Sequence, residues 1–236
     1  MGKSGLTAAQ ARRELYEVMA TDLPFSVKAD RALELGEEYL DVDNGHLTKI
    51  DRQADYWKAI NSTDPPDGQF PAGLRVELST TYCRRTVERG DSVALHDAPN
   101  QGLETDPAFE VHEIHCYHGT PVIVDEEIYG TLCFVADAPR ERPFTDEETL
   151  FAELMARMLE HELQRDRLLD RIDRLDQFAS VVSHDLRNPL NIARGRLSMA
   201  SKETDSENIE TAVDALERME DLITDVLDMA RQGHDI

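Results

Sequence analysis

The spacing of apolar and polar residues divides the chain into two parts with different periods. Up to about residue 144, helical spacing alternates with short segments of period two that are bounded by turn-forming residues. Helices are predicted over 6–20, from Pro24 to the turn at 43–45, and over 80–88; strands are predicted over 47–52, 56–61, 92–95, 114–124 and 128–135, with a loop over 61–73. The last two strands give the strongest hairpin signal, around the acidic turn 125–127. The pattern predicts a mixed domain of helices and strands.

From Thr145 onward the apolar period changes to about 3.5 residues. The first stripe comprises Phe151, Leu154, Met158, His161, Arg165, Leu168, Ile172, Leu175, Ala179, Val182 and Leu186. A continuous helix is predicted from Asp146 to about Ala200, and its polar interruptions also fit a loosely packed linker helix. A break is predicted at 204–206, followed by a second helix with the stripe Ala212, Leu216, Met219, Ile223, Val226 and Ala230. Two such helices cannot bury both stripes alone, so a homodimer with a four-helix bundle is predicted.

The acidic composition narrows the range of partners. The chain carries 48 Asp and Glu against 25 Lys and Arg, a formal charge of −23, which repels the phosphates of nucleic acid and of anionic lipid. We therefore expect no nucleic acid and no membrane among the partners. Salt relieves the self-repulsion of such a charge, so a halophilic protein from a salt-rich cytoplasm is expected, with an ordinary acidic protein as the alternative.

Three further features bear on location. The longest uninterrupted apolar stretch, 132–136, is far shorter than the roughly 20 residues that cross a bilayer. Residues 1–10 lack the apolar segment of a secretory signal, and three cysteines is a sparse and odd number for an exported protein. These features predict a cytoplasmic protein with reduced thiols.

His184 is the residue with the clearest potential chemistry. It falls between the inward positions Val182 and Leu186 and is therefore expected to point to solvent, while Pro189 is expected to kink the helix beside it. A neutral imidazole nitrogen can attack a γ-phosphoryl group, with Asp185 accepting the ring proton. Asn188, one turn further on, is placed to orient a water molecule for the reverse hydrolysis.

The segment Phe178-Ala-Ser-Val-Val-Ser-His184-Asp-Leu-Arg-Asn-Pro-Leu190 resembles the H-box of sensor histidine kinases, and the resemblance extends over residues 165–232. It implies that His184 is phosphorylated, that Asp185 is its acid/base partner, and that Asn188 serves in dephosphorylating the response regulator. Kinases of this type continue into an ATP-binding domain, whereas this chain stops at Ile236 and has no phosphate-cradling glycine loop. No cofactor is therefore expected in this chain; ATP and Mg²⁺ are expected only with a kinase domain, supplied in cis by a longer protein or in trans.

Residues 23–163 resemble a GAF domain, on the motifs Thr81-Tyr-Cys-Arg-Arg-Thr-Val87, Gly119–Val124 with Tyr129–Phe134, and Arg142–Glu148. The resemblance implies an α+β fold, an antiparallel sheet flanked by helices, with a pocket whose ligand the fold does not name. The predicted organisation is an N-terminal helix over 1–22, the GAF-like sensor over 23–163, the phosphoacceptor hairpin over 164–232 and a tail over 233–236.

A ligand site in the sensor is predicted from four residues, Trp57, Cys83, Cys116 and His118. Cys116 and His118 share one face of a strand, and if Cys83 faced the same pocket the three would suit zinc or iron. Their spacing matches no metal signature and buried cysteines commonly act as small apolar residues, so we predict no metal. Trp57, Tyr56, Tyr117 and Phe134 would suit an organic-ligand pocket or simple core packing. Cys133 is expected to face away from Leu132 and Phe134.

These observations predict the sensing and phosphoacceptor portion of a cytoplasmic two-component histidine kinase, with a second copy, a response regulator and an ATP-binding kinase domain as partners. Two alternatives stay open. One is a dimeric sensor or adaptor without phosphotransfer, and the other is a relay protein phosphorylated by another kinase.

Overall fold

The structure, a computed structural model, describes residues 5–203 and 207–232, apart from some side chains of the last two helices. The chain divides into two compact units, Met1–Arg165 and Asp166–Ile236, and each is described by itself. No helix in the described ranges is both long enough and apolar enough to cross a bilayer.

The first unit is built on a six-stranded sheet in the order β3-β2-β1-β6-β5-β4, in which all neighbouring strands are antiparallel. The strands are β1 (Asn44–Asp51), β2 (Tyr56–Ser62), β3 (Arg75–Glu77), β4 (Val93–Leu95), β5 (Cys116–Val124) and β6 (Glu127–Ala136). The predicted hairpin is β5–β6, joined by Asp125 and Glu126, which both have positive φ, as a type I′ turn requires. The α+β class with an antiparallel sheet is thus confirmed.

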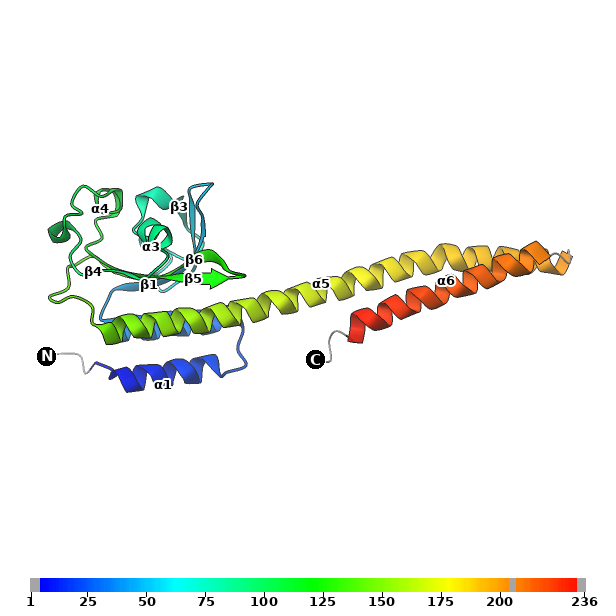
Figure 1. Cartoon of the computed structure of the whole chain (residues 1–236), viewed down its shortest axis with the longest axis horizontal. Coiled ribbons are helices and arrows are strands. Elements are labelled where there is room, and N and C mark those ends of the chain that lie inside the picture. Colours follow the sequence, from blue (N-terminus) through cyan, green and yellow to red (C-terminus); the bar gives the residue numbers. More distant parts are fainter. Residues whose placement is uncertain (1–4, 204–206, 233–236) are drawn as a thin grey trace. The chain divides into compact units, whose positions relative to one another are not determined.

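Helices cover both faces of this sheet (Figure 1). The α-helices are α1 (Ala8–Met19), α2 (Phe25–Leu40), α3 (Cys83–Arg89), α4 (Pro107–His112) and α5 (Asp146–Glu203), and two short 3-10 helices are η1 (Leu78–Thr80) and η2 (Pro99–Gln101). The sequence did not predict β3 or α4, which have three and six residues. Segments this short contain too few side chains to establish a period.

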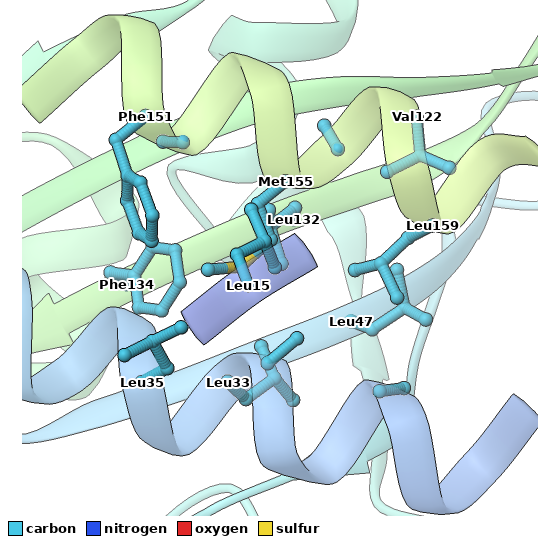
Figure 2. Packing of buried hydrophobic residues seen from close by; sticks show 14 of the residues in the cluster. Leu15, Leu33, Leu35, Leu47, Val122, Leu132, Phe134, Phe151, Met155 and Leu159 are labelled. Carbon is cyan, nitrogen blue, oxygen red and sulfur yellow. The ribbon is translucent and has the colours of Figure 1, made fainter. Parts of the chain in front are cut away.

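The unit has two hydrophobic cores, one on each face of the sheet. The first lies between the sheet and helices α1, α2 and α5, where Leu132 and Phe134 of β6 meet Phe151 and Met155 of α5 (Figure 2). The second lies beneath α3 and α4 and contains Cys133. Cys133 therefore faces away from Leu132 and Phe134, as the period of two predicts.

The face of α5 that packs on the sheet differs from the stripe predicted by the heptad count. Its buried apolar residues are Phe151, Ala152, Met155, Ala156, Leu159 and Leu163. Leu154 and His161 of the predicted stripe are exposed, and Leu150 is 56% exposed. The prediction was wrong here because it continued the three-and-four spacing of a coiled-coil seam into the sensor. The face that packs on the sheet instead repeats every four residues, at Phe151, Met155, Leu159 and Leu163, with Ala152 and Ala156 beside it.

A charged clamp fixes the start of α5. Glu148 and Thr145 form a reciprocal cap: each accepts a hydrogen bond from the other's backbone N–H, at 2.7 Å for the carboxylate and 3.2 Å for the hydroxyl. The Glu148 carboxylate also accepts hydrogen bonds from Arg140 at 2.9 Å and Arg142 at 2.8 Å. Although burial raises it, these hydrogen bonds bring the pKa of Glu148 down to about 2.

A buried ion pair joins α2 to α5. The Lys28 Nζ is fully buried and donates to the Met19 carbonyl at 2.9 Å and to Glu162 Oε2 at 2.7 Å. Arg165 contacts the same Glu162 oxygen at 2.9 Å. The lysine charge is therefore removed from water with one carboxylate, among the described residues, as its counter-charge.

The second unit consists of the remainder of α5 and of α6 (Glu207–Gln232). Arg194 Nη1 and Glu220 Oε2 form an ion pair at 2.7 Å between the two helices. The break predicted at 204–206 and the tail at 233–236 lie outside the described residues.

Candidate functional site

The phosphoacceptor segment lies within α5, which contains Pro189 in its interior. The His184 backbone is helical, while its side chain is outside the described set, so its orientation to solvent stays a prediction. The side chains of Asp185 and Asn188 are exposed. Since residues four apart share a face of a helix, Asn188 lies one turn beyond His184.

Large apolar side chains are exposed along this segment. They include Leu168, Leu175, Phe178, Val181, Leu186 and Ile192 of α5, and Met219 and Leu222 of α6. Phe178, six residues before His184, is 68% exposed. Apolar surface of this extent is typical of a face that another protein covers.

In the first unit, Trp57 of β2 lies against Cys83, the first residue of α3. Trp57 Nε1 donates a hydrogen bond to Cys83 Sγ at 3.2 Å. The Cys83 and Cys133 sulfurs are 3.7 Å apart, and both side chains are buried. Burial alone would raise the pKa of the Cys83 thiol, but hydrogen bonds with Cys133, Thr131 and Trp57 lower it to about 6. Cys133 is the partner in this group that sequence reasoning did not identify.

A small cavity of about 30 Å³ adjoins the two thiols. Its lining includes His46, Phe70, Tyr82 and Tyr117 besides Cys83 and Cys133. The His46 Nε2 is buried and makes no hydrogen bond within the described residues. Burial lowers the pKa of His46 to about 4, so the ring is neutral near pH 7.

Cys116 and His118 lie on the opposite face of the sheet. His118 Nε2 is 3.2 Å from Thr149 Oγ1 of α5, and its ring packs edge-on against Phe144. Burial raises the pKa of the Cys116 thiol to about 12. The structure therefore brings Trp57 and Cys83 together but separates them from Cys116 and His118.

This separation decides whether the cysteines form a metal site or act as small buried apolar residues. The condition for a three-ligand metal site, that Cys83 faces the same pocket as Cys116 and His118, is not met because the sheet lies between them. Among the described residues, no group of three His, Cys, Asp or Glu side chains is arranged to hold a metal ion.

A wider surface hollow of about 670 Å³ lies next to the small cavity. Half of its lining residues are acidic, namely Glu104, Glu110, Glu113 and Asp137. His112 lines both the hollow and the cavity. The two spaces therefore meet at this histidine.

Two family models match the chain. The GAF domain matches residues 26–163, more than half of the chain, and the His Kinase A (phospho-acceptor) domain matches residues 174–235. This order of domains is that of a sensor histidine kinase, and no ATP-binding domain is detected in the chain. No match was found among the curated proteins.

Solved structures support the fold. The GAF domain of a phosphoenolpyruvate-protein phosphotransferase from Coxiella burnetii is 20% identical, with a TM-score of 0.57 over 72% of this chain and 99% of that one. The corresponding Acinetobacter domain is 16% identical, with a TM-score of 0.55 over 67% and 92%. Free methionine-R-sulfoxide reductase from Neisseria meningitidis is 15% identical, with a TM-score of 0.55 over 72% and 97%. At these identities the likeness shows the fold alone.

Proposed function

Because the chain belongs to the GAF domain family and continues into a His Kinase A phosphoacceptor domain, we propose that it is the sensing and phosphoacceptor portion of a cytoplasmic two-component histidine kinase. The single observation that carries the proposal is the phosphoacceptor match over 174–235, which includes His184 and its flanking motif. The phosphoryl donor is ATP held by a kinase domain in cis or in trans, and the acceptor is an aspartate of a response regulator.

The three motif residues divide the chemistry between them. A ring nitrogen of His184 attacks the γ-phosphorus, an N–P bond forms, and the bond to the β–γ bridging oxygen breaks as ADP leaves. Asp185 accepts the proton of the other ring nitrogen and so raises the basicity of the attacking one. The phosphoryl group then passes to the regulator carboxylate, and Asn188 orients the water that later hydrolyses it.

We include a homodimer in the proposal. The phosphoacceptor family is one whose members dimerise, and the exposed apolar residues of α5 and α6 support burial against a second copy. Two helices from each chain would form a four-helix bundle in which these side chains share one core.

The test uses the purified chain in high salt with labelled ATP, with and without an ATP-binding domain from a related kinase. We expect acid-labile phosphate only when that domain is added, and none on His184→Gln. His161→Gln is the matched control because His161 is another histidine of the same helix and its side chain is exposed.

Other outcomes would contradict the proposal in distinct ways. A folded dimer that takes up no label under any condition would favour a sensor or adaptor without phosphotransfer. Label that does not need the added domain would reveal an ATP site in this chain. Label on His184 from an unrelated phosphorylated kinase alone would favour a relay protein.

A further inference from the structure

We propose that Cys83 and Cys133 form a peroxide-reactive dithiol, which a small neutral hydroperoxide oxidises to an intrachain disulfide. The pair lies on α3 and β6, 50 residues apart in the sequence. The inference names the stimulus of the proposed sensor, so its signalling consequence rests on the proposed function, whereas the thiol chemistry does not.

The first observation is that the two thiols lie close together within a buried core. The two sulfurs are 3.7 Å apart, and they must approach by only about 1.7 Å to reach a disulfide bond length. Both side chains are buried between α3 and the sheet, which holds the sulfurs together and shields them from other thiols. Cys116, the third cysteine, is separated from the pair by the sheet.

The second observation is the cavity beside the sulfurs. At about 30 Å³ it holds a molecule of roughly the size of water, whereas pockets for organic ligands occupy about 300–1,000 Å³. His46 lines this cavity, and its buried Nε2 has no hydrogen-bond partner in the described part of the chain. A hydroperoxide both fits the space and offers the hydroxyl groups that this nitrogen lacks.

The acidic residues of the neighbouring hollow favour neutral oxidants over anionic ones. The outer hollow that shares His112 with the cavity is lined by four carboxylates, Glu104, Glu110, Glu113 and Asp137. They repel anions, in a protein whose net charge is already −23. A neutral oxidant such as hydrogen peroxide is therefore favoured over anionic oxidants such as hypochlorite.

The chemistry balances with peroxide as the oxidant. The Cys83 thiol loses its proton, and the thiolate attacks one peroxide oxygen, so that an S–O bond forms and the O–O bond breaks. The departing hydroxide takes up the released proton and leaves as water. Cys133 then attacks the sulfenic sulfur, the S–S bond forms, the S–O bond breaks and a second water leaves. Cys83 is the attacking group because Trp57 and Cys133 lower the pKa of its thiol, while that of Cys133 is raised.

Oxidation would pull on β6 at the face that carries Cys133 and so alter the packing on the opposite face, which contacts α5. Cys133 lies on β6 between Leu132 and Phe134, which pack against α5 residues including Met155 (Figure 2). Drawing Cys133 toward α3 shifts the strand that supports this contact. In the proposed kinase, α5 is the helix that carries His184, so this shift is the regulatory step.

The experiment treats the full chain with hydrogen peroxide under native conditions, then unfolds it and alkylates the remaining thiols. We expect two of the three thiols to be lost, with a Cys83–Cys133 cross-link found by mass spectrometry after cleavage at glutamate. Such cleavage separates Cys116 from Cys133, because Glu126 and Glu127 lie between them. The only tryptophan, Trp57, contacts Cys83, so its fluorescence should change with the same time course.

Three variants make the result specific. Cys116→Ser is the matched control and should form the cross-link at the wild-type rate. Cys133→Ser should stop at a Cys83 sulfenic acid, which a 1,3-dione present during unfolding traps, and Cys83→Ser should give neither product. Persistence of all three thiols in folded wild-type protein, or loss of Cys116 at the same rate as Cys83, would overturn the proposal.

The link to signalling is measured separately. With the added kinase domain, peroxide should change phosphate uptake by wild type and Cys116→Ser but not by Cys133→Ser. A cross-link without any uptake of label at His184 would contradict the proposed function alone. Normal uptake without a cross-link would contradict the dithiol alone.

Discussion

Replacing Glu148 by glutamine is expected to destabilise the sensor unit in a manner that depends strongly on pH. In the folded protein the Glu148 carboxylate caps α5 through the Thr145 N–H and binds Arg140 and Arg142. Glutamine keeps the size of the side chain and one acceptor oxygen. It loses the charge that both guanidinium groups neutralise.

The magnitude follows from the pKa of Glu148, which lies at about 2 in the folded protein against an ordinary value of 4.5. At 1.36 kcal/mol for each pKa unit, this difference corresponds to about 3 kcal/mol of folding free energy. The side chain is 6% exposed, so solvent screens the interaction weakly. Because the folded pKa is depressed, this stability is present above pH 4.5 and is lost as the pH falls through about 2.

The assay is urea unfolding of the full chain in high salt, followed by the fluorescence of Trp57, which lies in the first unit. Wild type and Glu148→Gln are compared from pH 7 to pH 3 at sub-micromolar concentration, because the series passes the isoelectric point near 4.6. Groups that do not interact with Glu148 titrate equally in both proteins, so the difference between them reports on Glu148 and on His118, whose pKa the Glu148 charge raises. Glu147→Gln, a change to a neighbouring carboxylate of the same helical turn, is the matched control.

We expect a difference of about 3 kcal/mol at pH 7 that shrinks steadily below pH 4.5, as Glu148 of the wild type becomes protonated and resembles glutamine. The control should differ from wild type by less than about 0.5 kcal/mol throughout. A difference that is small at pH 7, or one that stays constant across the series, would refute the assignment of this stability to the carboxylate charge.

Three further predictions concern the same unit and use the same unfolding assay. Glu162→Gln should cost about 3 kcal/mol because it leaves the Lys28 charge buried without a carboxylate, whereas Lys28→Met should cost less; equal costs would contradict this reasoning. Gly130→Ala should cost at least about 2 kcal/mol, since its Cβ would lie 1.9 Å from the Thr48 carbonyl oxygen, and an unchanged urea midpoint would show that the strands can separate. Burial lowers the pKa of His46 to about 4, so the unfolded protein binds a proton here before the folded protein does, and the free energy of unfolding falls as the pH drops from 6.5 toward 4. His46→Gln should flatten this pH dependence. An unaltered slope would exclude His46 as its source.

Much of the fold could be predicted from the sequence because its longer elements have clear periods. Helices α1 and α2 and the β5–β6 hairpin begin and end within a few residues of the predicted positions. The elements that were missed, β3 and α4, are short. For α4 a local signal exists, because Asp106 accepts a hydrogen bond from the Ala108 N–H and precedes a proline at the first helical position.

The candidate site was harder to predict because it depends on how elements dock. The period of two already separates Cys133 from Phe134, and Cys116 from Tyr117. It does not determine which helix lies over which face of the sheet. The pairing of Cys83 with Cys133 requires α3 to lie on the β6 face that carries Cys133, and that arrangement arises only from long-range packing.

The two outermost strands of the sheet, β3 and β4, have only three residues each. An uncovered strand edge presents N–H and C=O groups that another chain can extend into a longer sheet. Edges this short offer little template for such growth. The sensor unit is therefore protected against edge-to-edge polymerisation even at the high concentrations of a crowded cell.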